Sequence, residues 1–559
     1  MTGTTRDAVA AALAAGLRSA AVEHGWDLPA DVAVAVERPG DPTHGDYATN
    51  IAMRLAKPLR LAPLQIAEAI GARVLAQRSD DDAIAAVEVA RPGFLNVRLS
   101  PAWLALQVDA IVAAGDGYGR SARLVGQRVQ VEFVSANPTG PMHVGNARGG
   151  PLGDVMARVL TFAGAAVVRE YYVNDSGNQV EIFGRTLAVR YRELCGETGL
   201  EIPEGGYAAP YVIELARQIR DEDAARYDGL TLEEQARVLA PRAIEVLVAG
   251  HKVTALRFGI RFDNFTYETS LLSSGYFEET VAELRRRGHV EDRDGAVWFR
   301  SRELGEDIDS VLVRSNGLPT YFGVDVAYHR QVLSSLGFDR KIDIWGANTH
   351  GHARRMKLAM GALDLGEKWQ VVIYQFVKFL HEGVLVKMGK RTGQFLLLDD
   401  VLDAVGVDAT RFFLLQSGAD RSLDFDFELA VQQSNENPVY YAQYAHARIA
   451  SVFRNAREQG LTWDDADLSL LGDPAALDVV RSCLRFPELA SDLAETGQVH
   501  QLTAYASELA GLFHPWYKVN RVLTDDRALS KARLRLIEAV AVTLRQTFAL
   551  LGVSAPERM

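Results

Sequence analysis

The chain is poor in cysteine. Only Cys195 and Cys483 occur among its 559 residues, and they are widely separated. A disulfide framework or a cysteine-bound metal site is therefore not expected, and a reducing, cytoplasmic location is the default. No run of apolar residues has the length of a membrane span, so we expect no membrane association. The amino terminus also lacks a signal-peptide pattern, because Asp7 and other polar residues make it an amphipathic helix.

Positive charge is not in excess either. The formal net charge is −12 at pH 7, which argues against a protein that coats nucleic acid nonspecifically. A local basic face for one structured RNA is compatible with that balance. Hydrophobic residues make up 48% of the chain, which is ample for large cores, and the chain is too long for a single core. We therefore expect three domains.

Residues 1–117 are expected to form a small α+β domain, which ends at a glycine-rich segment, 115–119. Hydrophobic periodicity distinguishes its helical from its alternating stretches. Its elements are, in order, a helix (about 6–24), an alternating run (31–37), a helix (about 51–77) and two strands (85–90 and 94–100).

Residues 118–432 show strand patterns that alternate with helical ones. This alternation predicts an α/β, Rossmann-like domain with a parallel sheet and helices on its faces. The expected elements are strands at 129–134, 166–174, 341–347 and 370–379, and a helix at 153–165.

Residues 433–559 are predicted to form an all-α helical bundle. Near the end, apolar residues recur at steps of three and four, which is typical of one buried helix face. Gly552 supplies a stop signal after this helix. The apolar positions are Ile537, Val540, Ala541, Leu544, Phe548 and Leu551.

The segment 136–146 has the features of a phosphate-binding turn. It follows a predicted strand, contains Pro138 and Gly140, and leads into a helix. His143 and Asn146 would lie at the helix start, where free N–H groups and the dipole attract anions. Gly145 lets a nucleotide approach the backbone closely. The alternative is a turn whose histidine only caps a helix.

A basic loop lies far downstream, over residues 386–393. Lys387 and Lys390 are three residues apart and could clamp the β- and γ-phosphates of a nucleotide, with Met388 beside them. The alternative is a solvated basic loop. Pro151, early in the helix after the first segment, falls within the first turn or kinks it.

These two segments resemble the signature motifs of class I aminoacyl-tRNA synthetases. His143–Asn146 resembles the HIGH motif and Lys387–Lys390 the KMSK motif. Asn146 and Gly389 stand where the motifs usually carry histidine and serine. The resemblance implies that His143 and Asn146 act at the α-phosphate of ATP, and that the two lysines act on the leaving pyrophosphate.

Segments along the whole chain are similar to the arginyl-tRNA synthetase family. The resemblance implies ATP-dependent joining of L-arginine to tRNA(Arg) through arginyl-adenylate, by a monomer that needs bound tRNA for activation. It also implies Mg²⁺ held mainly by ATP phosphates rather than by a protein metal site, an amino-terminal domain at the tRNA elbow and an anticodon-binding bundle. The matching segments are 132–149, 172–179, 321–329, 437–448 and 551–559.

An arginine pocket needs acidic groups, because a planar guanidinium pairs with carboxylates in fork geometry. Tyr321 and Asp325 are four residues apart and share a helix face. The resemblance places Glu132, Tyr321 and Asp325 around the guanidinium, and Ser135 and Asn137 near the α-amino and carboxylate end. The alternative for each carboxylate is a surface charge or an internal ion pair.

The segment 345–352 resembles one that borders the nucleotide. His350 and Gly351 are the expected ATP contacts, whereas the role of Thr349 is open. A His/His/Asp metal site here would lack an acidic residue, so none is expected.

Single-stranded tRNA bases stack on aromatic or planar side chains. The candidates are Tyr440, Tyr441, Tyr444 and Arg448 at the start of the bundle and Met559 at its end; helix packing is the alternative for the tyrosines.

Three other functions would fit part of these features. The first is another class I synthetase, such as the glutamyl or cysteinyl enzyme, although the candidate pocket is acidic and cysteine ligands are lacking. The second is a tRNA-binding scaffold without catalysis, against which His143, Lys387 and Lys390 argue. The third is a nucleotidyltransferase of the same superfamily, which would not need the bundle or the amino-terminal domain.

Overall fold

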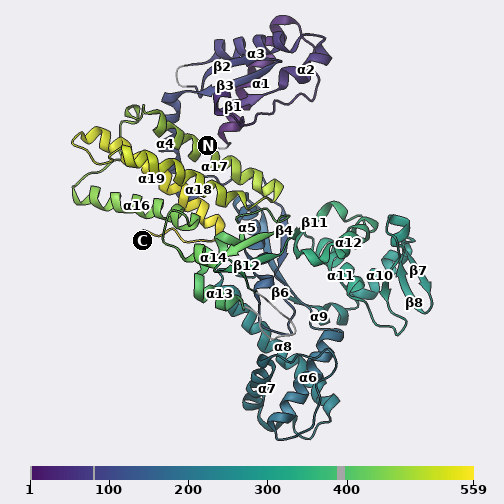
Figure 1. The fold of residues 1–559 in the computed structure, drawn as a ribbon. Coiled ribbons are helices and arrows are strands. Elements are labelled where there is room, and N and C mark those ends of the chain that lie inside the picture. The colour runs from purple at the N-terminus through teal and green to yellow at the C-terminus, as the bar shows by residue number, and fades with distance from the viewer. Residues whose placement is uncertain (1–2, 80–81, 387–396) are drawn as a thin grey trace.

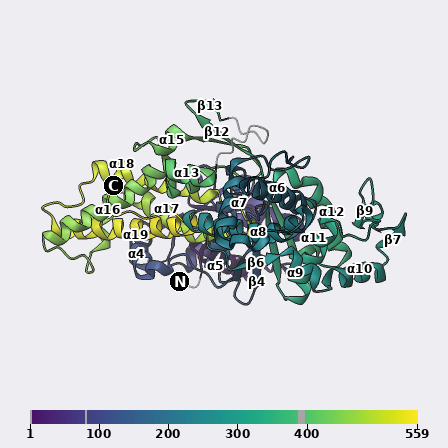
Figure 2. The ribbon, with the colours of Figure 1, turned by 90° about the horizontal axis from the view of Figure 1, so that it is seen from below.

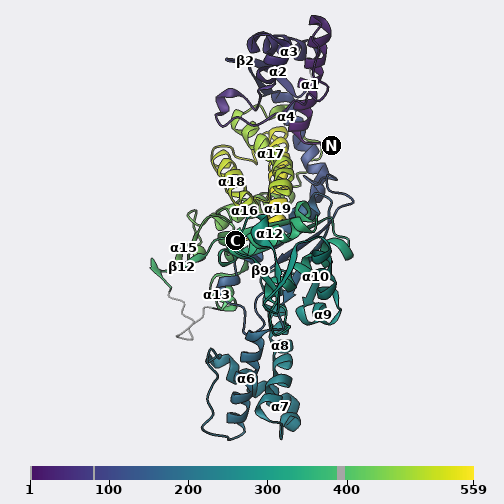
Figure 3. The same ribbon diagram turned by 90° about the vertical axis from the view of Figure 1, so that its right-hand side faces the viewer.

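The structure is a computed structural model that describes residues 3–79, 82–386 and 397–559. Lys387, Met388 and Lys390 of the predicted basic loop lie outside the described residues. The molecule is elongated, with the amino-terminal domain at one end, the carboxy-terminal helices next to it, a sheet in the middle and a helical arm at the far end (Figures 1 and 3).

The amino-terminal domain packs three helices on a small antiparallel sheet of order β1-β3-β2. Its first helix begins with a capping box between Thr4 and Asp7 and ends at Gly25 in the left-handed conformation. The elements are α1 (Thr5–His24), β1 (Tyr47–Thr49), α2 (Ile51–Leu59), α3 (Pro63–Gln77), β2 (Ile84–Ala90) and β3 (Phe94–Leu99).

One expectation for this domain is wrong. The single helix over 51–77 is two helices, because Arg60 has a positive φ of 55° and Pro63 starts a new helix. The alternating run 31–37 forms no strand, and within it only Glu37 pairs, with Ala48. Alternation alone does not make a strand where no neighbouring strand offers its backbone.

The central sheet has five strands, and every neighbouring pair is parallel. Its order is β11-β10-β4-β5-β6, so the chain starts in the middle and winds outward in both directions. Ligands bind outside the carboxyl ends of the strands where the order reverses, which here is between β4 and β10. The strands are β4 (Arg128–Phe133), β5 (Ala166–Val173), β6 (Asn264–Tyr267), β10 (Arg340–Gly346) and β11 (Trp369–Tyr374).

The predicted α/β fold is thus confirmed, with one correction in its strands. The run 370–379 is not one strand but divides between β11 and β12 (Val377–His381). The second strand belongs to a separate sheet, with β13 (Val384–Leu385) and β14 (Leu423–Asp426). This small sheet projects from one side of the molecule (Figure 2).

Helix α5 (Gly149–Phe162) follows β4 and lies directly against it. A Cβ atom on Gly153 would be 2.1 Å from Cγ of Phe133, so only glycine permits this approach. Pro151 is the third residue of the helix and lies within the first turn, where its missing N–H is not needed.

Two insertions interrupt the sheet. The first is the helical arm, between β5 and β6, and consists of α6 (Asn178–Leu194), α7 (Pro210–Asp223) and α8 (Leu232–Arg257). The second lies between β6 and β10, and helix α12 (His350–Ala362) follows β10. The second insertion contains α9 (Glu268–Ser273), α10 (Tyr276–Arg286), β7 (Val290–Arg293), β8 (Ala296–Phe299), β9 (Ser310–Val313) and α11 (Tyr321–Arg330).

The carboxy-terminal part is a helical bundle, as predicted, and its last helix ends at Gly552 with φ 68°. Helix α4 (Pro101–Ala114), which follows the amino-terminal sheet, packs on α17 and α19 of this bundle. The helices of the bundle are α16 (Pro438–Glu458), α17 (Pro474–Thr496), α18 (Gln501–Val519) and α19 (Arg527–Leu551), and they are preceded by α13 (Leu398–Val405), α14 (Val407–Leu414) and α15 (Phe427–Val431).

Ion pairs and hydrogen bonds connect the amino-terminal domain to the bundle. Glu488 of α17 is buried and accepts hydrogen bonds from Nε of Arg38 at 2.8 Å and from the hydroxyl of Tyr47 at 2.5 Å. Arg6 binds Asp492 with both terminal nitrogens, each at 2.8 Å. Within the described ranges, none of the helices combines the length and the apolar composition that a bilayer crossing requires.

Candidate active site

The turn after β4 brings Ser135 back onto Glu132. Val134 and Ser135 have positive φ values of 70° and 35°, a conformation that a β-branched residue such as valine strongly disfavours. Such backbone outliers persist where the surrounding contacts impose them, often at functional sites. Here the Ser135 hydroxyl donates to Glu132 at 3.2 Å and accepts the backbone N–H of Tyr172 at 3.1 Å.

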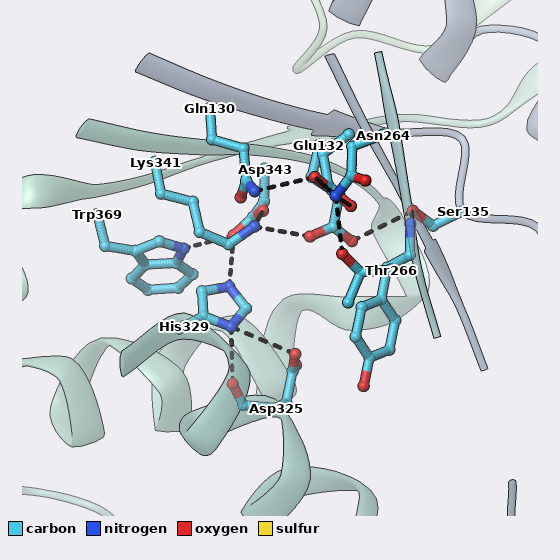
Figure 4. A network of polar contacts seen from close by, with 12 residues as sticks. Gln130, Glu132, Ser135, Asn264, Thr266, Asp325, His329, Lys341, Asp343 and Trp369 are labelled. Carbon is cyan, nitrogen blue, oxygen red and sulfur yellow. Dashed lines mark hydrogen bonds and ion pairs between the residues drawn. The ribbon is translucent and has the colours of Figure 1, made fainter. Parts of the chain in front are cut away.

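A chain of buried charged side chains runs from β4 to α11 (Figure 4). Nζ of Lys341 lies 2.6 Å from a carboxylate oxygen of Glu132 and 2.6 Å from one of Asp343. The other oxygen of Asp343 is 2.7 Å from Nε2 of His329. Nδ1 of His329 is in turn 3.3 Å from the Asp325 carboxylate. Acidic and basic groups therefore alternate along the whole chain of contacts.

The ionisation states follow from burial and from these neighbours. Burial raises the pKa of Glu132 to about 7, against the opposing effect of Lys341. Burial lowers the pKa of His329, but Asp343 and Asp325 outweigh it and raise that pKa to about 9. Burial opposes ionisation of Asp325, yet its histidine neighbours hold its pKa well below the usual range. Asp325 is thus held as an anion, and burial makes Glu132 the weaker acid of the two carboxyls.

Tyr321 and Asp325 both contact a further histidine, His352. Oδ2 of Asp325 is 2.5 Å from Nε2 of His352, and the ring centroids of Tyr321 and His352 are 5.0 Å apart. The expectation that both point to one side of the helix is confirmed by this shared contact. The expectation that no acidic residue joins the histidine segment 345–352 is wrong, because Asp325 reaches it from another helix.

The predicted phosphate-binding turn has the geometry of a helix start. His143 precedes the short 3-10 turn Val144–Asn146, and its Nδ1 accepts the backbone N–H of Gly145 at 3.0 Å. A Cβ atom on Gly145 would be 2.6 Å from the His143 ring, so the ring packs on bare backbone. The histidine does cap this turn, and the cap fixes the orientation of its ring.

The remaining ATP candidates lie around the carboxyl ends of β4 and β10. Pro138 is buried and Gly140 half-buried in the loop after β4, and Asn146 is half-buried at the end of the 3-10 turn. His350 and Gly351 begin α12 and are exposed, and a Cβ on Gly351 would meet no atom within 4 Å. Asn137, expected near the α-amino and carboxylate end of arginine, is exposed in the same loop as Pro138.

Leu397, the first described residue after 387–396, lies directly beside His143. Leu397 pairs with His143 in an isolated antiparallel bridge, and the backbone N–H of Leu398 donates to the carbonyl of Met142 at 3.1 Å. Leu397 and Leu398 are therefore anchored on the loop that carries the first motif.

The four candidates for base stacking in α16 form a half-buried row with a histidine of α18. The rings of Tyr440 and Tyr444 stack with centroids 5.9 Å apart, and Arg448 lies 4.5 Å above the Tyr444 ring. Tyr441 contacts His514 with centroids 4.6 Å apart. Their partial exposure fits both base stacking and helix packing. Met559 is 51% exposed at the end of the chain.

The sequence interpretation missed four site residues: Lys341, Asp343, His329 and His352. A signal was present for the first two. They are two apart in a strand of a parallel sheet, so they share one face, and such strands are normally apolar on both faces. A charged pair at those positions indicates a polar pocket, because lysine and aspartate are almost never fully buried unless paired.

Comparisons with known proteins define first the class of this catalytic domain. Residues 107–451 match the family model described as tRNA synthetases class I (R), catalytic domain. Residues 5–99 match the arginyl tRNA synthetase N terminal domain, and residues 442–559 match the DALR anticodon binding domain. The doubly wound sheet and the turn after its first strand agree with that class.

Similar proteins then identify the family. The chain is 45% identical over 552 residues to the arginine--tRNA ligase of Carboxydothermus hydrogenoformans, covering 98% of each chain. It is also 45% identical over 533 residues to that of Syntrophotalea carbinolica, covering 94% of this chain and 95% of that protein. The arginyl-tRNA synthetase structure from Thermus thermophilus has the same fold, with a TM-score of 0.76 at 23% identity and coverage of 99% and 100%. The chain belongs to the arginyl-tRNA synthetase family, as the sequence motifs predicted.

Proposed function

We propose that this chain joins L-arginine to tRNA(Arg) at the expense of ATP, and that the substrate guanidinium binds between Asp325 and Glu132. The observation that carries the assignment of the pocket is the chain of buried charges that ends in these two carboxylates. One is held ionised and the other is poised to ionise. A guanidinium supplies the planar set of donors that such carboxylates accept.

The remaining groups of the pocket suit the rest of the amino acid. The ring of Tyr321 is 57% exposed at the start of α11 and could cover the guanidinium plane. Ser135, held beside Glu132, and Asn137 of the following loop would bind the α-amino and carboxylate end. A smaller or neutral analogue would not bridge the two carboxylates, which is a strong basis for discrimination.

The ATP end of the site needs no enzyme nucleophile. A carboxylate oxygen of arginine forms a bond to the α-phosphorus, and the bond to the β-phosphate bridging oxygen breaks, releasing pyrophosphate. The terminal adenosine hydroxyl of the tRNA then attacks the adenylate carbonyl, and AMP leaves. Catalysis consists of alignment and of stabilising charge on phosphate oxygens.

We assign the residues around ATP accordingly. His143 and Asn146 act at the α-phosphate, and Lys387 and Lys390 act on the pyrophosphate, with Mg²⁺ held mainly by the phosphates. The remaining contacts to the nucleotide are assigned to Pro138, Gly140, Gly145, His350, Gly351 and Met388.

We assign the three regions of the chain to different parts of the tRNA. Residues 1–117 would contact the tRNA elbow, 118–432 the acceptor end and the small substrates, and 433–559 the anticodon loop, through the stacked row and Met559. The chain would act as a monomer in the cytoplasm.

A charging assay tests this function. Arginine, ATP and bulk tRNA should give arginine-dependent AMP formation, and the absence of AMP would refute it. Pyrophosphate exchange should require tRNA; equal exchange with and without tRNA would refute the dependence on tRNA but not the function.

Arginine binding should depend on pH through Glu132. Its pKa of about 7 means that the carboxyl is neutral below that pH and ionised above it. Because a guanidinium prefers the ionised form, affinity should rise roughly tenfold from about pH 6 to pH 8, with release of a proton. Calorimetry in buffers of different ionisation enthalpy measures both quantities. The Glu132→Gln variant should lose the pH slope; a wild-type affinity that does not change with pH would contradict the assignment.

Truncation of Tyr444 should weaken tRNA binding. Stacking on one base contributes about 1–3 kcal/mol, so Tyr444→Ala should raise the KM for tRNA about tenfold while the KM for arginine stays unchanged. Tyr444→Phe keeps the ring and is the matched control. If the alanine and phenylalanine variants had the same KM for tRNA, the tyrosine would serve helix packing only.

A further inference from the structure

The loop between β4 and the first motif is held at both ends by side chains from outside it. At its start, the hydroxyl of Tyr171 in β5 accepts the backbone N–H of Ala136 at 3.0 Å. At its end, Nε2 of His251 in α8 lies 2.7 Å from the carbonyl oxygen of Gly140. The hydroxyl of Tyr211 in α7 donates to the neighbouring carbonyl of Thr139. Two of these three side chains come from the helical arm.

The hydrogen bonds of His251 determine which of its nitrogens carries the proton. A carbonyl oxygen only accepts, so Nε2 must donate to Gly140. In the neutral ring Nδ1 then accepts, and its neighbour at 2.8 Å is the Tyr171 hydroxyl, whose single proton can go either to Nδ1 or to the carbonyl oxygen of Ala136 at 3.2 Å. That hydroxyl oxygen can still accept from Ala136. Burial lowers the pKa of His251, which favours the neutral ring.

Tight packing supports the same picture independently of the hydrogen bonds. A Cβ atom on Gly140 would lie 3.2 Å from the Tyr211 hydroxyl oxygen. His251 is only 1% exposed, although it lies near the end of a long helix of the arm. Pro138 and Pro141 have no N–H to donate, which reduces the number of donors within the loop. The contacts at the end of the loop therefore come from the arm.

We propose that His251 and Tyr211 are positioning residues through which the helical arm sets the geometry of the ATP-binding loop. They touch no substrate; they hold the carbonyls of Thr139 and Gly140 and thereby place Gly145 and His143, a few residues further on. The proposal rests on the proposed placement of ATP at this loop. A misplacement of catalytic groups by a fraction of an ångström is enough to reduce turnover markedly.

Steady-state kinetics of tRNA charging test the proposal with shape-conserving variants. His251→Phe and Tyr211→Phe each remove the donors but keep a ring. Each should raise the KM for ATP about tenfold and lower kcat, while the KM for arginine stays within about twofold. The matched control is Tyr191→Phe, a buried tyrosine of the same arm whose hydroxyl donates to the carbonyl of Ala224 at 3.2 Å, away from the loop. Its kinetics should equal those of the wild type.

Two further variants separate the contacts of His251. In His251→Gln the amide can reach the position of Nε2 and donate to Gly140, whereas in His251→Asn it reaches only the position of Nδ1 and can serve Tyr171. The glutamine variant should recover most of the lost ATP affinity and the asparagine variant should not. A general loss of stability would affect both alike, so this difference reports on the carbonyl contact.

The result that would overturn the proposal is ATP kinetics of His251→Phe and Tyr211→Phe that match those of Tyr191→Phe, whatever their melting temperatures. Titration of the wild type and the variants with a nonhydrolysable ATP analogue, without arginine, keeps this outcome separate from a failure of the proposed function. If the wild type did not charge tRNA with arginine, the function would be wrong, yet a weaker analogue affinity of the two variants would still support the role of the arm.

Discussion

Replacement of Asp325 by asparagine should raise the KM for arginine roughly a thousandfold. Asp325 is buried, and its carboxylate is held ionised by His329 and His352. Removal of one partner from a buried ion pair costs about 3–5 kcal/mol, because the other charge is left without compensation. Since about 1.4 kcal/mol corresponds to a factor of ten in affinity, this loss is about two to three and a half orders of magnitude. The KM for ATP should change little.

The control for this variant is Asp292→Asn. Asp292 pairs with Arg285 on the surface of the second insertion, where loss of a charge has little effect. Both variants are measured by charging kinetics with arginine varied at saturating ATP and tRNA. If Asp325→Asn and Asp292→Asn had the same KM for arginine, Asp325 would not bind the substrate.

Replacement of Lys341 by methionine should destabilise the catalytic domain strongly. The lysine is fully buried between two carboxylates, and its ammonium lies 4.7 Å above the ring of Tyr328. Methionine fills a similar volume but leaves Glu132 and Asp343 without their shared cation. The expected cost is about 3–5 kcal/mol, or a fall in melting temperature on the order of 5–10 °C.

The double variant Lys341→Met/Glu132→Gln distinguishes charge from packing. At a pH at which Glu132 is ionised it removes one of the two carboxylates left without their cation, so it should then melt at a higher temperature than Lys341→Met alone. Thermal unfolding followed by tryptophan fluorescence monitors this region, because Trp369 hydrogen-bonds Asp343. A single variant that melts like the wild type would show that Lys341 does not balance the carboxylates.

The parts of the fold that the sequence predicted correctly are those with local signals. The strand before His143, the helix after it and the last helix before Gly552 all follow from periodicity and from turn residues close by in the chain. The two local errors also have local causes. Arg60 and Pro63 interrupt a helical pattern that hydrophobic periodicity alone does not break, and the run 370–379 crosses from one sheet to another without a turn signal.

The ion pairs of the site could not be predicted from local sequence signals. Lys341 contacts Glu132 across 209 positions, and Asp325 contacts His352 across 27. These pairs exist only because β4 and β10 are neighbours in the sheet and because α11 packs against α12. The hydrogen bond between His251 and Gly140 likewise joins residues that are 111 positions apart, so it too depends on the tertiary fold. The motif therefore predicted where the ATP-binding loop lies, whereas the side chains that hold the loop could be identified only from the tertiary structure.

The most direct test of the central claim is an experimental structure of the protein with L-arginine and a nonhydrolysable ATP analogue bound. The account predicts guanidinium nitrogens within hydrogen-bonding distance of the Asp325 and Glu132 carboxylates, and the α-phosphate beside His143. Arginine bound at another place, or phosphates remote from the turn Val144–Asn146, would contradict it.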